Sequence, residues 1–438
     1  MEKNSSILIV GGGTWGLSSA LHLARRGYNN VTIFDPYPIP SPISAGNDVN
    51  KIVDHATQST TSDESYIGSK LFHATISGWR EDPVFKPFYH ETGTIFAASS
   101  AEGEAGLKRR EMTDDAEPGA ITRLNTPEDF KRLMKPGALT GDFPGWRGWH
   151  KKGTAGSGFV NAKNSMISAA AEVKRLGVKF VTGAEDGQVV QLTYSNSNVT
   201  GIKTKNGLEH HADCTILSAG AMTDQIFDTE GQLLPKCWTL MHIKLTDAEV
   251  EIYRDNPVMY NTERGFFIPD LESKELKICN EFPGYTNFST DSSGRIRSVP
   301  VARQEIPIEA EERARAYLRE CMPHLAERPF SFARICWCAD TPDRSFLIGR
   351  HPTYTNLLLA SGDSGRSFMH IPSIGGFIVD SMEGIIDPIM ANAWRWRPET
   401  AIGRDLAAPQ GRAGGTGKPE DLRDVKGWTD GKITHALL

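Results

Sequence analysis

The sequence predicts a mixed α/β and α+β fold, in which a domain built on a parallel sheet carries an inserted antiparallel-sheet domain. Three observations predict it. Residues 5–35 follow the order strand, glycine-rich turn, helix and strand, which is typical of a parallel βαβ unit. Residues 233–340 alternate short β-like runs with turns, as in an antiparallel sheet. Apolar strands return at 211–221 and 356–362, so the parallel sheet is expected to draw its strands from separated parts of the chain.

The first element is a βαβ unit that ends on an acidic residue. Residues 7–10 form a continuous apolar run, as expected for a strand buried on both faces of a sheet. A helical segment over 17–26 and a second apolar strand over 31–34 follow, and Asp35 closes the unit. Strand, G-x-G-x-x-G turn, helix, strand and acid within about thirty residues form the fingerprint of a Rossmann-type dinucleotide site.

Each glycine of the turn has a mechanical task. Gly11 permits the tight turn, Gly13 lets backbone amides approach a pyrophosphate at the helix N-terminus, and Gly16 lets the helix lie close to the strand. Asp35 is predicted to accept hydrogen bonds from the ribose of an adenosine. The unit therefore predicts a bound dinucleotide.

The other elements follow from periodicity and composition. Residues 36–52 are rich in Pro, Ser and Gly and predict a loop that wraps a cofactor and ends near its reactive ring. Residues 105–142 are charged and lack a long apolar strand, which suggests a peripheral lobe. The tail after Trp396 is expected to be disordered or to lie as a strap across the surface. Helices are expected over 63–79, 164–176, 310–321 and 373–383, a strand over 178–181, and a β-meander over 189–203.

Lys51 and two cysteines are the first candidate reactive groups. Lys51 ends the loop and is a candidate catalytic residue, although a solvated surface lysine is the commoner role. The six cysteines, at positions 214, 237, 279, 321, 336 and 338, are scattered and predict buried thiols rather than a disulfide framework. Cys336 and Cys338 would share one face of a strand. No C-x-x-C motif or histidine pair accompanies them, so no metal site is expected.

Length and charge limit the class of function. A chain of 438 residues is too long for one simple core, so two interleaved lobes are expected. The formal net charge of −6 argues against nucleic acid or an anionic membrane as a main partner, and no apolar stretch reaches spanning length. The chain runs into strand 7–10 without room for a signal peptide, so we expect a cytoplasmic protein. Its last tripeptide, residues 436–438, does not match a peroxisomal Ser-Lys-Leu signal.

Several stretches resemble a known family. The segments GGGTWGLSSALHLARRGY, DPYPIPSPISAGNDVNKI, DPVFKPFYHETG, FSFARICWCADTPDRSFLIGRHP and GDSGRSFMHIPSIG are similar to the fungal fructosyl amine oxidases (amadoriases), within the sarcosine oxidase group of FAD enzymes. The similarity covers nearly the whole chain. It implies a glutathione reductase or D-amino acid oxidase-like fold, an FAD cofactor, and a monomeric oxidase. Such an oxidase cleaves the C–N bond of a fructosyl amine with O2 and releases glucosone, the free amine or amino acid, and H2O2.

The resemblance also implies a domain layout and a set of cofactor-binding residues. We assign residues 1–85, 150–230 and 330–390 to a discontinuous FAD-binding domain, 86–149 and 231–329 to a substrate domain, and 391–438 to a C-terminal strap or lid. Cofactor-binding residues are expected at Gly11, Gly13, Thr14, Trp15, Gly16, Asp35, Ser44, Lys51, Ala219, Gly220, Cys336, Asp363, Gly365, Phe368 and Met369.

Three site assignments, one for cofactor binding, one catalytic and one for substrate binding, come from matching motif positions. Cys336 matches the cysteine that binds the flavin 8α-methyl group through a thioether, and Cys338 is then a bystander; two buried structural thiols are the alternative. Lys277 matches the oxygen-activating lysine, whose cation stabilises the negative charge that develops on oxygen. Glu281 matches a sugar-contacting carboxylate, and strand alternation would turn it toward the same cavity as Lys277. Without the resemblance, a surface ion pair of the two would be preferred.

The remaining substrate contacts are partly preserved. Arg412, in the tail, matches the arginine that pairs with Glu281, which makes the tail a lid that excludes water. Arg110 matches an arginine that holds the carboxylate of the amino-acid half, although Arg109 beside it leaves the match uncertain by one.

Two positions depart from the family. Gln58 stands where a tyrosine is expected and Met369 where a lysine is common, so two of three carboxylate anchors are changed. This favours a substrate with a different or uncharged amine substituent. A second hypothesis is therefore an amadoriase-like oxidase of an N-methyl or cyclic amino acid or of a secondary-metabolite amine. A third, a flavin-binding protein that has lost turnover, is disfavoured by the presence of Lys277.

Overall fold

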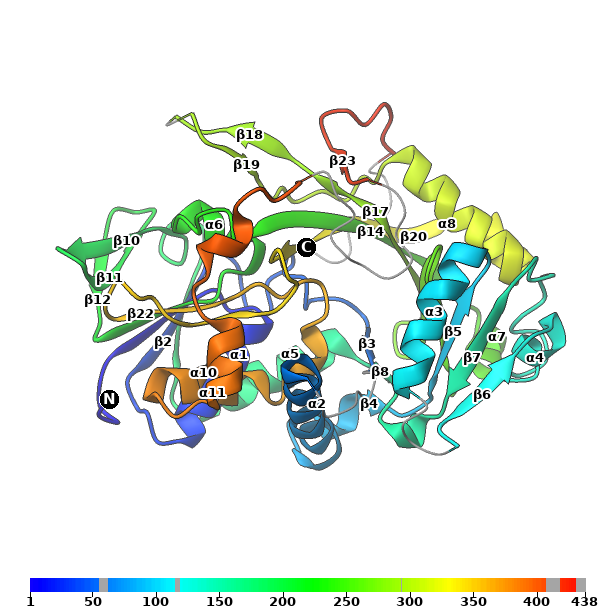
Figure 1. The fold of residues 1–438 in the computed structure, drawn as a ribbon, viewed down its shortest axis with the longest axis horizontal. Helices are drawn as coiled ribbons and strands as arrows, with labels where there is room; N and C mark the ends of the chain where they lie inside the picture. Colours follow the sequence, from blue (N-terminus) through cyan, green and yellow to red (C-terminus); the bar gives the residue numbers. More distant parts are fainter. Residues whose placement is uncertain (55–61, 115–118, 293, 407–417, 431–438) are drawn as a thin grey trace.

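The computed structural model describes residues 1–54, 62–114, 119–292, 294–406 and 418–430, without the side chains of 109–114 and 281–283. Two sheets organise this part of the chain. Figure 1 shows the helix-covered parallel sheet on the left and the larger sheet extending to the right, with its own helices at the far end.

The first sheet has six strands in the order β21-β22-β13-β1-β2-β9. All neighbouring strands are parallel except β21, which is antiparallel to β22. Ile7 and Ile9 lie in one hydrophobic core and Leu8 and Val10 in another, so the apolar run of β1 is buried on both faces, as predicted. The strands are β1 (Ile7–Val10), β2 (Val31–Asp35), β9 (Lys179–Thr182), β13 (Cys214–Leu217), β21 (Leu347–Arg350) and β22 (Leu357–Ser361).

A helical layer covers one face of this sheet. Its members are α1 (Thr14–Arg25), α2 (Asp63–Glu81), α5 (Ala162–Arg175), α10 (Ile374–Glu383) and α11 (Pro388–Trp394). Helices α1 and α10 approach each other closely at Ser18. Its hydroxyl donates to the carbonyl of Ile371 at 2.6 Å and accepts from the amide of Gly375 at 2.8 Å. A Cβ on Gly375 would lie 2.1 Å from the carbonyl oxygen of Ser18, so only glycine fits there.

A small antiparallel sheet covers the opposite face. It consists of β10 (Val189–Ser195), β11 (Asn198–Thr204) and β12 (Glu209–His211), and its apolar residues pack against Leu8 and Val10. The meander predicted over 189–203 is therefore present, with one further strand.

The larger sheet has nine strands, eight of them in the order β20-β14-β17-β16-β15-β5-β7-β6, with β23 pairing beside β17. Most pairs are antiparallel, as predicted, but β15 runs parallel to β5 and β17 runs parallel to β23. The strands are β5 (Thr94–Ala98), β6 (Ile121–Leu124), β7 (Arg147–Lys151), β14 (Leu234–Lys244), β15 (Val258–Asn261), β16 (Gly265–Asp270), β17 (Glu275–Thr286), β20 (Phe330–Asp340) and β23 (Glu420–Asp421).

Short elements complete the described chain. Those around the larger sheet are α3 (Ala101–Asp114), α4 (Pro127–Lys131), α7 (Asp247–Tyr253), α8 (Ile308–Cys321) and α9 (Pro323–Ala326). The others are β3 (Lys51–Val53), β4 (Tyr89–His90), β8 (Gly158–Val160), α6 (Thr223–Ile226) and the hairpin β18 (Phe288–Thr290) and β19 (Ile296–Ser298). Five 3-10 turns are η1 (Lys86–Phe88), η2 (Gly153–Ala155), η3 (Gly220–Met222), η4 (Phe368–His370) and η5 (Pro398–Ala401).

Three features differ from the sequence predictions. Strand β20 lies within the range 330–390 that we assigned to the cofactor domain, yet it pairs with β14 in the larger sheet. Residues 119–142, within the range predicted to be a peripheral lobe, are part of that sheet, because β6 is its edge strand and Phe130 lies in its core. Helix α7 was not predicted. Its capping box, in which Thr246 and Glu249 bond each other's backbone amides, was visible in the sequence as T-x-x-E.

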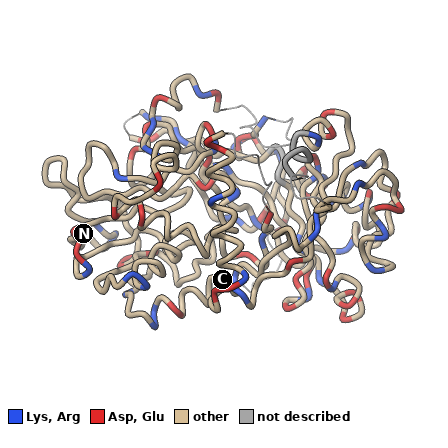
Figure 2. The backbone as a smooth tube through the Cα atoms, turned by 60° about the horizontal axis from the view of Figure 1, so that its bottom comes forward, with Lys and Arg blue, Asp and Glu red and all other residues tan. Residues whose placement is uncertain are grey.

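Basic and acidic positions alternate along the described backbone. Figure 2 shows basic and acidic positions interspersed over both sheets and their helices. Within the described residues, no helix is both long enough and apolar enough to cross a membrane, and no group of three or more His, Cys, Asp or Glu side chains is arranged to hold a metal ion.

Candidate active site

A cavity of about 950 Å³ is lined by residues of both sheets. The β1–α1 turn, the loop 41–46 and residues 218–222 form one wall, and aromatic side chains from the larger sheet, including Tyr260 and Phe266, form the other. Of the cofactor-binding residues expected from the sequence, all except Gly16 line this cavity. The turn, the loop and the strand ends that the sequence singled out are thus brought to one place.

The glycine turn leaves room for a ligand where it is needed. Gly11 has φ +99°, and a Cβ there would lie 2.6 Å from the carbonyl oxygen of Ser218. A Cβ on Gly16 would lie 1.9 Å from the carbonyl oxygen of Gly11, which is the close helix–strand packing predicted for the third glycine. A Cβ on Gly13 would instead meet the Ser44 hydroxyl at 3.4 Å and project into the cavity. The start of the twelve-residue helix α1 has no side-chain cap, so its first amides fit a pyrophosphate.

Asp35 is fixed at the edge of the cavity. Its Oδ2 accepts from the amide of Gly12 and its Oδ1 from the amide of Tyr37, both at 2.9 Å. Burial raises the pKa of this carboxyl, and the two amide hydrogen bonds oppose the shift. The carboxylate is held by backbone donors with lone pairs left for a ribose, so the residues present fit the adenosine half of FAD.

The loop after β2 is held in place by Arg334, which sequence reasoning missed. Its guanidinium, on β20, donates to the carbonyls of Pro42 at 2.9 Å, Ser44 at 3.2 Å and Asn47 at 2.9 Å. Arg334 is buried and lines the cavity. One side chain of the larger sheet therefore determines the path of the loop that the sequence predicts to wrap the cofactor.

Cys336 lies on β20 at the cavity wall. It is half-buried, stands opposite Trp238 of β14 in the strand register, and lines the cavity together with Trp337 and Cys338. Cys338 is buried. The more accessible thiol of the two is thus the one that the family resemblance selects.

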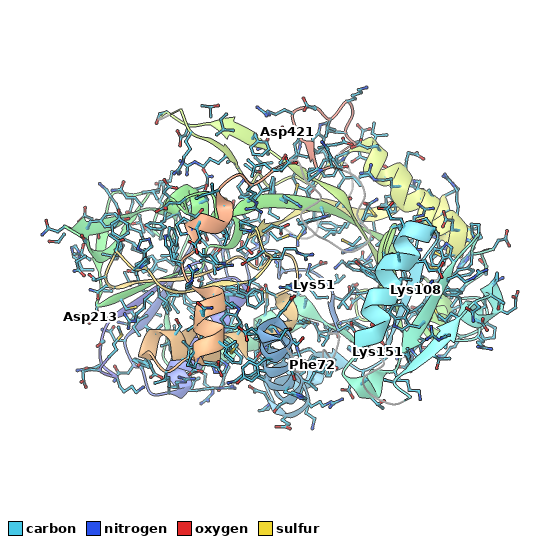
Figure 3. The ribbon with its side chains drawn as sticks, in the orientation of Figure 1. Lys51, Phe72, Lys108, Lys151, Asp213 and Asp421 are labelled. Carbon is cyan, nitrogen blue, oxygen red and sulfur yellow. The ribbon has the colours of Figure 1, made fainter. Side chains whose placement is uncertain are left out.

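Two lysines meet at a buried aspartate beside the cavity. The Asp48 Oδ2 atom lies 2.6 Å from the Lys277 Nζ and 2.8 Å from the Lys51 Nζ. Lys277 also donates to the carbonyl of Asn50 at 2.8 Å, and its ammonium lies 5.3 Å from the centroid of the Phe266 ring. Lys51 lines the cavity, whereas Lys277 stands behind it and is fully buried. Figure 3 shows Lys51 near the middle of the molecule, where the two halves meet.

The pKa values of these three side chains are shifted by burial and by one another. Burial alone would raise the pKa of the Asp48 carboxyl, but the ammonium groups of Lys277 and Lys51 hold it well below its ordinary value. Burial alone would lower the pKa of Lys51, but Asp48 raises it. For Lys277, burial and the like charge of Lys51 prevail over Asp48 and lower its pKa. Lys277 is therefore the cation of the pair that releases a proton more readily.

The substrate-binding residues expected from the sequence are only partly described. Met369, in η4, lines the cavity, and its carbonyl accepts from the Trp79 indole at 2.6 Å. Gln58 and Arg412 lie outside the described residues. Arg109 and Arg110 belong to α3 and Glu281 belongs to β17, but their side chains are not described.

Strand alternation does not by itself relate Glu281 to Lys277. In the pairing of β14 with β17, Thr239 stands opposite Asn280 and Cys237 opposite Tyr285. Two steps along β14 therefore correspond to five steps along β17, so β17 bulges over 281–284. The register is regular from Lys277 to Asn280 and the bulge begins after it, so the direction of Glu281 stays a prediction.

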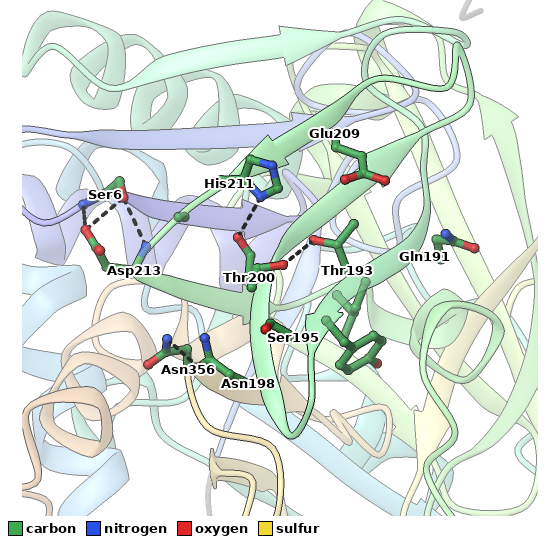
Figure 4. Close-up of a pocket in the computed structure, with 13 residues that line it drawn as sticks. Ser6, Gln191, Thr193, Ser195, Asn198, Thr200, Glu209, His211, Asp213 and Asn356 are labelled. Atoms are coloured by element: carbon green, nitrogen blue, oxygen red, sulfur yellow. Dashed lines mark hydrogen bonds between the residues drawn. The ribbon is translucent and has the colours of Figure 1, made fainter.

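A second depression lies on the surface over the small sheet. Figure 4 shows that its polar side chains mainly bond one another and the backbone. The Ser6 hydroxyl donates to Asp213 at 2.9 Å, and the hydroxyls of Thr193 and Thr200 lie 3.0 Å apart. It brings together no reactive groups comparable to the lysine pair, so the candidate active site is the cavity between the sheets.

Comparison with known proteins gives one consistent result. The model of the family DAO, FAD dependent oxidoreductase, matches residues 6–381. The chain is 48% identical to the fructosamine oxidase Amadoriase II of Aspergillus fumigatus, with a TM-score of 0.95 and coverage of 100% of this chain and 99% of that chain. It is 49% identical to Amadoriase I of the same organism, with a TM-score of 0.94 and the same coverage. Among curated proteins, L-saccharopine oxidase of Schizosaccharomyces pombe is 28% identical over 90% of this chain and 93% of its own length.

Proposed function

Because the chain belongs to the DAO family of FAD-dependent oxidoreductases, we propose that it is an FAD-dependent oxidase of secondary amines that cleaves the C–N bond of fructosyl amines. The products are glucosone, the free amine or amino acid, and H2O2. The observation that carries this proposal is the full-length likeness to two fructosyl amine oxidases together with a lysine pair beside the dinucleotide cradle.

Each described residue of the site has a role in this reaction. Bound FAD supplies a two-electron acceptor for the amine and a donor to O2. The turn at Gly13 would hold the pyrophosphate and Asp35 the ribose, while Arg334 holds the loop that would enclose the cofactor. The Lys277 ammonium stabilises the negative charge that forms on oxygen as it is reduced. The buried position of that ammonium, balanced by Asp48, keeps it in a region from which water is largely excluded.

Anaerobic reduction tests the function directly. Fructosyl-valine, fructosyl-lysine, a fructosyl alkylamine, sarcosine and pipecolate are each mixed with the holoenzyme without O2, and the flavin absorbance is followed. A fructosyl amine is expected to bleach the flavin fastest, and admission of O2 is expected to restore the colour with release of H2O2. Faster bleaching by sarcosine or pipecolate would establish the N-methyl or cyclic amino acid hypothesis, and no bleaching by any amine would contradict oxidase function.

We propose that Cys336 binds the flavin covalently through its thiol. Support comes from its place at the cavity wall, where it is half-buried. Acid precipitation of the parent protein is expected to leave the yellow colour on the protein, and Cys336→Ala is expected to release all of it. Cys338→Ala is the matched control, two residues along the same strand, and should retain the colour. Release from the parent would contradict the tether.

Met369 is proposed to set the preference for the amine substituent. Met369→Lys places a cation on the cavity wall and is expected to raise kcat/KM for carboxylate-bearing fructosyl amino acids by roughly 10- to 100-fold, since a charge-assisted hydrogen bond contributes about 1.5–3 kcal/mol. The kcat/KM for a fructosyl alkylamine should not rise, because that substrate has no carboxylate. Met369→Leu keeps the side-chain volume and adds no charge. It should leave the ratio of the kcat/KM values for the two substrates unchanged. Equal kcat/KM changes for both substrates in Met369→Lys would overturn this role.

A further inference from the structure

A row of buried titratable side chains leads away from the lysine pair through the larger sheet. The Asp48 Oδ1 atom lies 3.9 Å from the Nε2 of His242, and the His242 Nδ1 lies 2.9 Å from the Glu275 Oε2. All three side chains are less than a tenth exposed. The strand register places His242 of β14 directly opposite Lys277 of β17, so the imidazole and the lysine share one face of the sheet.

The far end of this row reaches solvent. The Glu275 Oε1 atom accepts from the Ser331 hydroxyl at 2.9 Å and lies 3.0 Å from the Lys244 Nζ. The side chain of Lys244 is 63% exposed. Glu275 thus stands between a buried imidazole and an exposed ammonium, and the row Lys277, Asp48, His242, Glu275 joins the cavity wall to the protein surface.

The pKa values of His242 and Glu275 are shifted in opposite directions. Burial alone would lower the pKa of His242, but Asp48 and Glu275 raise it. The pKa of Glu275 is held at about 2, because His242, Lys244 and Ser331 outweigh its burial. The charged groups around the imidazole are Asp48 and Lys51 from the loop and β3, Glu275 and Lys277 from β17, Lys244 on its own strand, and Arg334 from β20. His242 therefore holds a proton beside Asp48, on the side of the row that faces Lys277.

The proposed reaction needs such a connection. Oxidation of a secondary amine removes a hydride equivalent from carbon and a proton from nitrogen, and reduction of O2 to H2O2 takes up the same electron pair, its hydrogen and one proton. The two half-reactions occur at different times, so the proton from the amine must leave and another must be available when O2 reacts. Lys277 is a buried cation behind the cavity wall whose pKa is lowered, so it is a group that can give up a proton.

We propose that Asp48, His242 and Glu275 form a proton path that links Lys277 to solvent and returns to it the proton it gives to reduced oxygen. The proposal rests on the oxidase function above. Lys277 donates one proton to the oxygen, and its amine regains one from His242 through Asp48, while His242 is reprotonated from the side of Glu275. The 3.9 Å step between Asp48 and His242 closes by a movement of about 1 Å or through a bridging water.

The test separates the path from the substrate. The holoenzyme is reduced with dithionite, so that no amine is required, and its reoxidation by O2 is followed by stopped flow against pH in H2O and in D2O. His242→Gln, which fills a similar space but relays no proton, is expected to slow reoxidation roughly 10-fold or more and to change its pH profile. Glu275→Gln, at the outer end, should slow it less. His324→Gln is the control, since His324 bonds Thr140 and Tyr253 and does not line the cavity.

Each outcome decides the proposal. A solvent isotope effect on reoxidation of the parent that disappears in His242→Gln supports the path. Reoxidation of His242→Gln at the parent rate with the parent pH profile, or a parent without any solvent isotope effect, overturns it. NMR titration of the His242 ring gives a readout apart from turnover: its pKa should lie above 6.5 in the parent and fall in Asp48→Asn. If no amine reduces the flavin, the oxidase proposal fails, and the reoxidation arm still tests the path.

Discussion

Lys277→Met is expected to slow the reaction of the reduced enzyme with O2 by about 10²–10³-fold, the cost typical of removing one preorganised group that stabilises a developing charge. Methionine is unbranched and one atom shorter than lysine, and it carries no charge. Reduction of the flavin by substrate should change much less, because no oxygen is reduced in that half-reaction and no charge on oxygen needs to be stabilised. Stopped-flow measurement of both half-reactions separates the two effects.

The pH dependence of reoxidation is a second test of the role of Lys277. Burial lowers the pKa of Lys277 below 10.5, so its ammonium is present at low pH and is lost as pH rises through that lowered value. Reoxidation of the parent should therefore slow toward high pH, and the slowing should be absent in Lys277→Met. Lys236→Met is the matched control, another fully buried lysine, paired with Asp340 at 3.3 Å in the same sheet. If Lys277→Met consumed O2 as fast as the parent, the assigned role would be wrong.

Asp48→Asn is expected to lower the free energy of unfolding by about 3–5 kcal/mol at neutral pH. Removing one partner of a buried ion pair leaves the other charge uncompensated, and here two ammonium groups lose their shared carboxylate. Urea unfolding of the parent and variant holoenzymes measures the difference. Asp247→Asn, which breaks the exposed pair with Lys274, should cost under about 1 kcal/mol.

The loss in Asp48→Asn should depend on pH in a defined direction. Because the pKa of Asp48 is lowered in the folded state, its stabilisation is present above the unfolded value near 4 and is lost as pH falls through the folded value. The stability curves of parent and variant should therefore run parallel at neutral pH and converge in acid. Parallel curves throughout would show that Asp48 stabilises the fold through packing rather than through its charge.

Local patterns predicted local structure well. The glycine turn, the strand buried on both faces and the acid at Asp35 lie within one short segment, and their geometry follows from steric and hydrogen-bonding rules that act between near neighbours. Helices such as α5 and α10 followed from periodicity to within about two residues at each end.

The missed residues act across long stretches of sequence. Arg334 reaches the loop at Pro42, and Asp48 meets Lys277, only because two sheets assemble from distant segments. The relation of His242 to Lys277 depends on strand register, which the hydrophobic pattern of either strand alone does not specify. The bulge in β17 had no signal beyond Gly284, whose φ of +82° permits it.

The pairing of β1 with β13 and the contact of Ser18 with Gly375 bear on biosynthesis. The cavity that fits the cofactor draws its wall from residues as early as Val10 and as late as Met369. A nascent chain therefore presents an unfinished cradle on the ribosome, and flavin capture has to wait until the last third of the polypeptide has been released and docked.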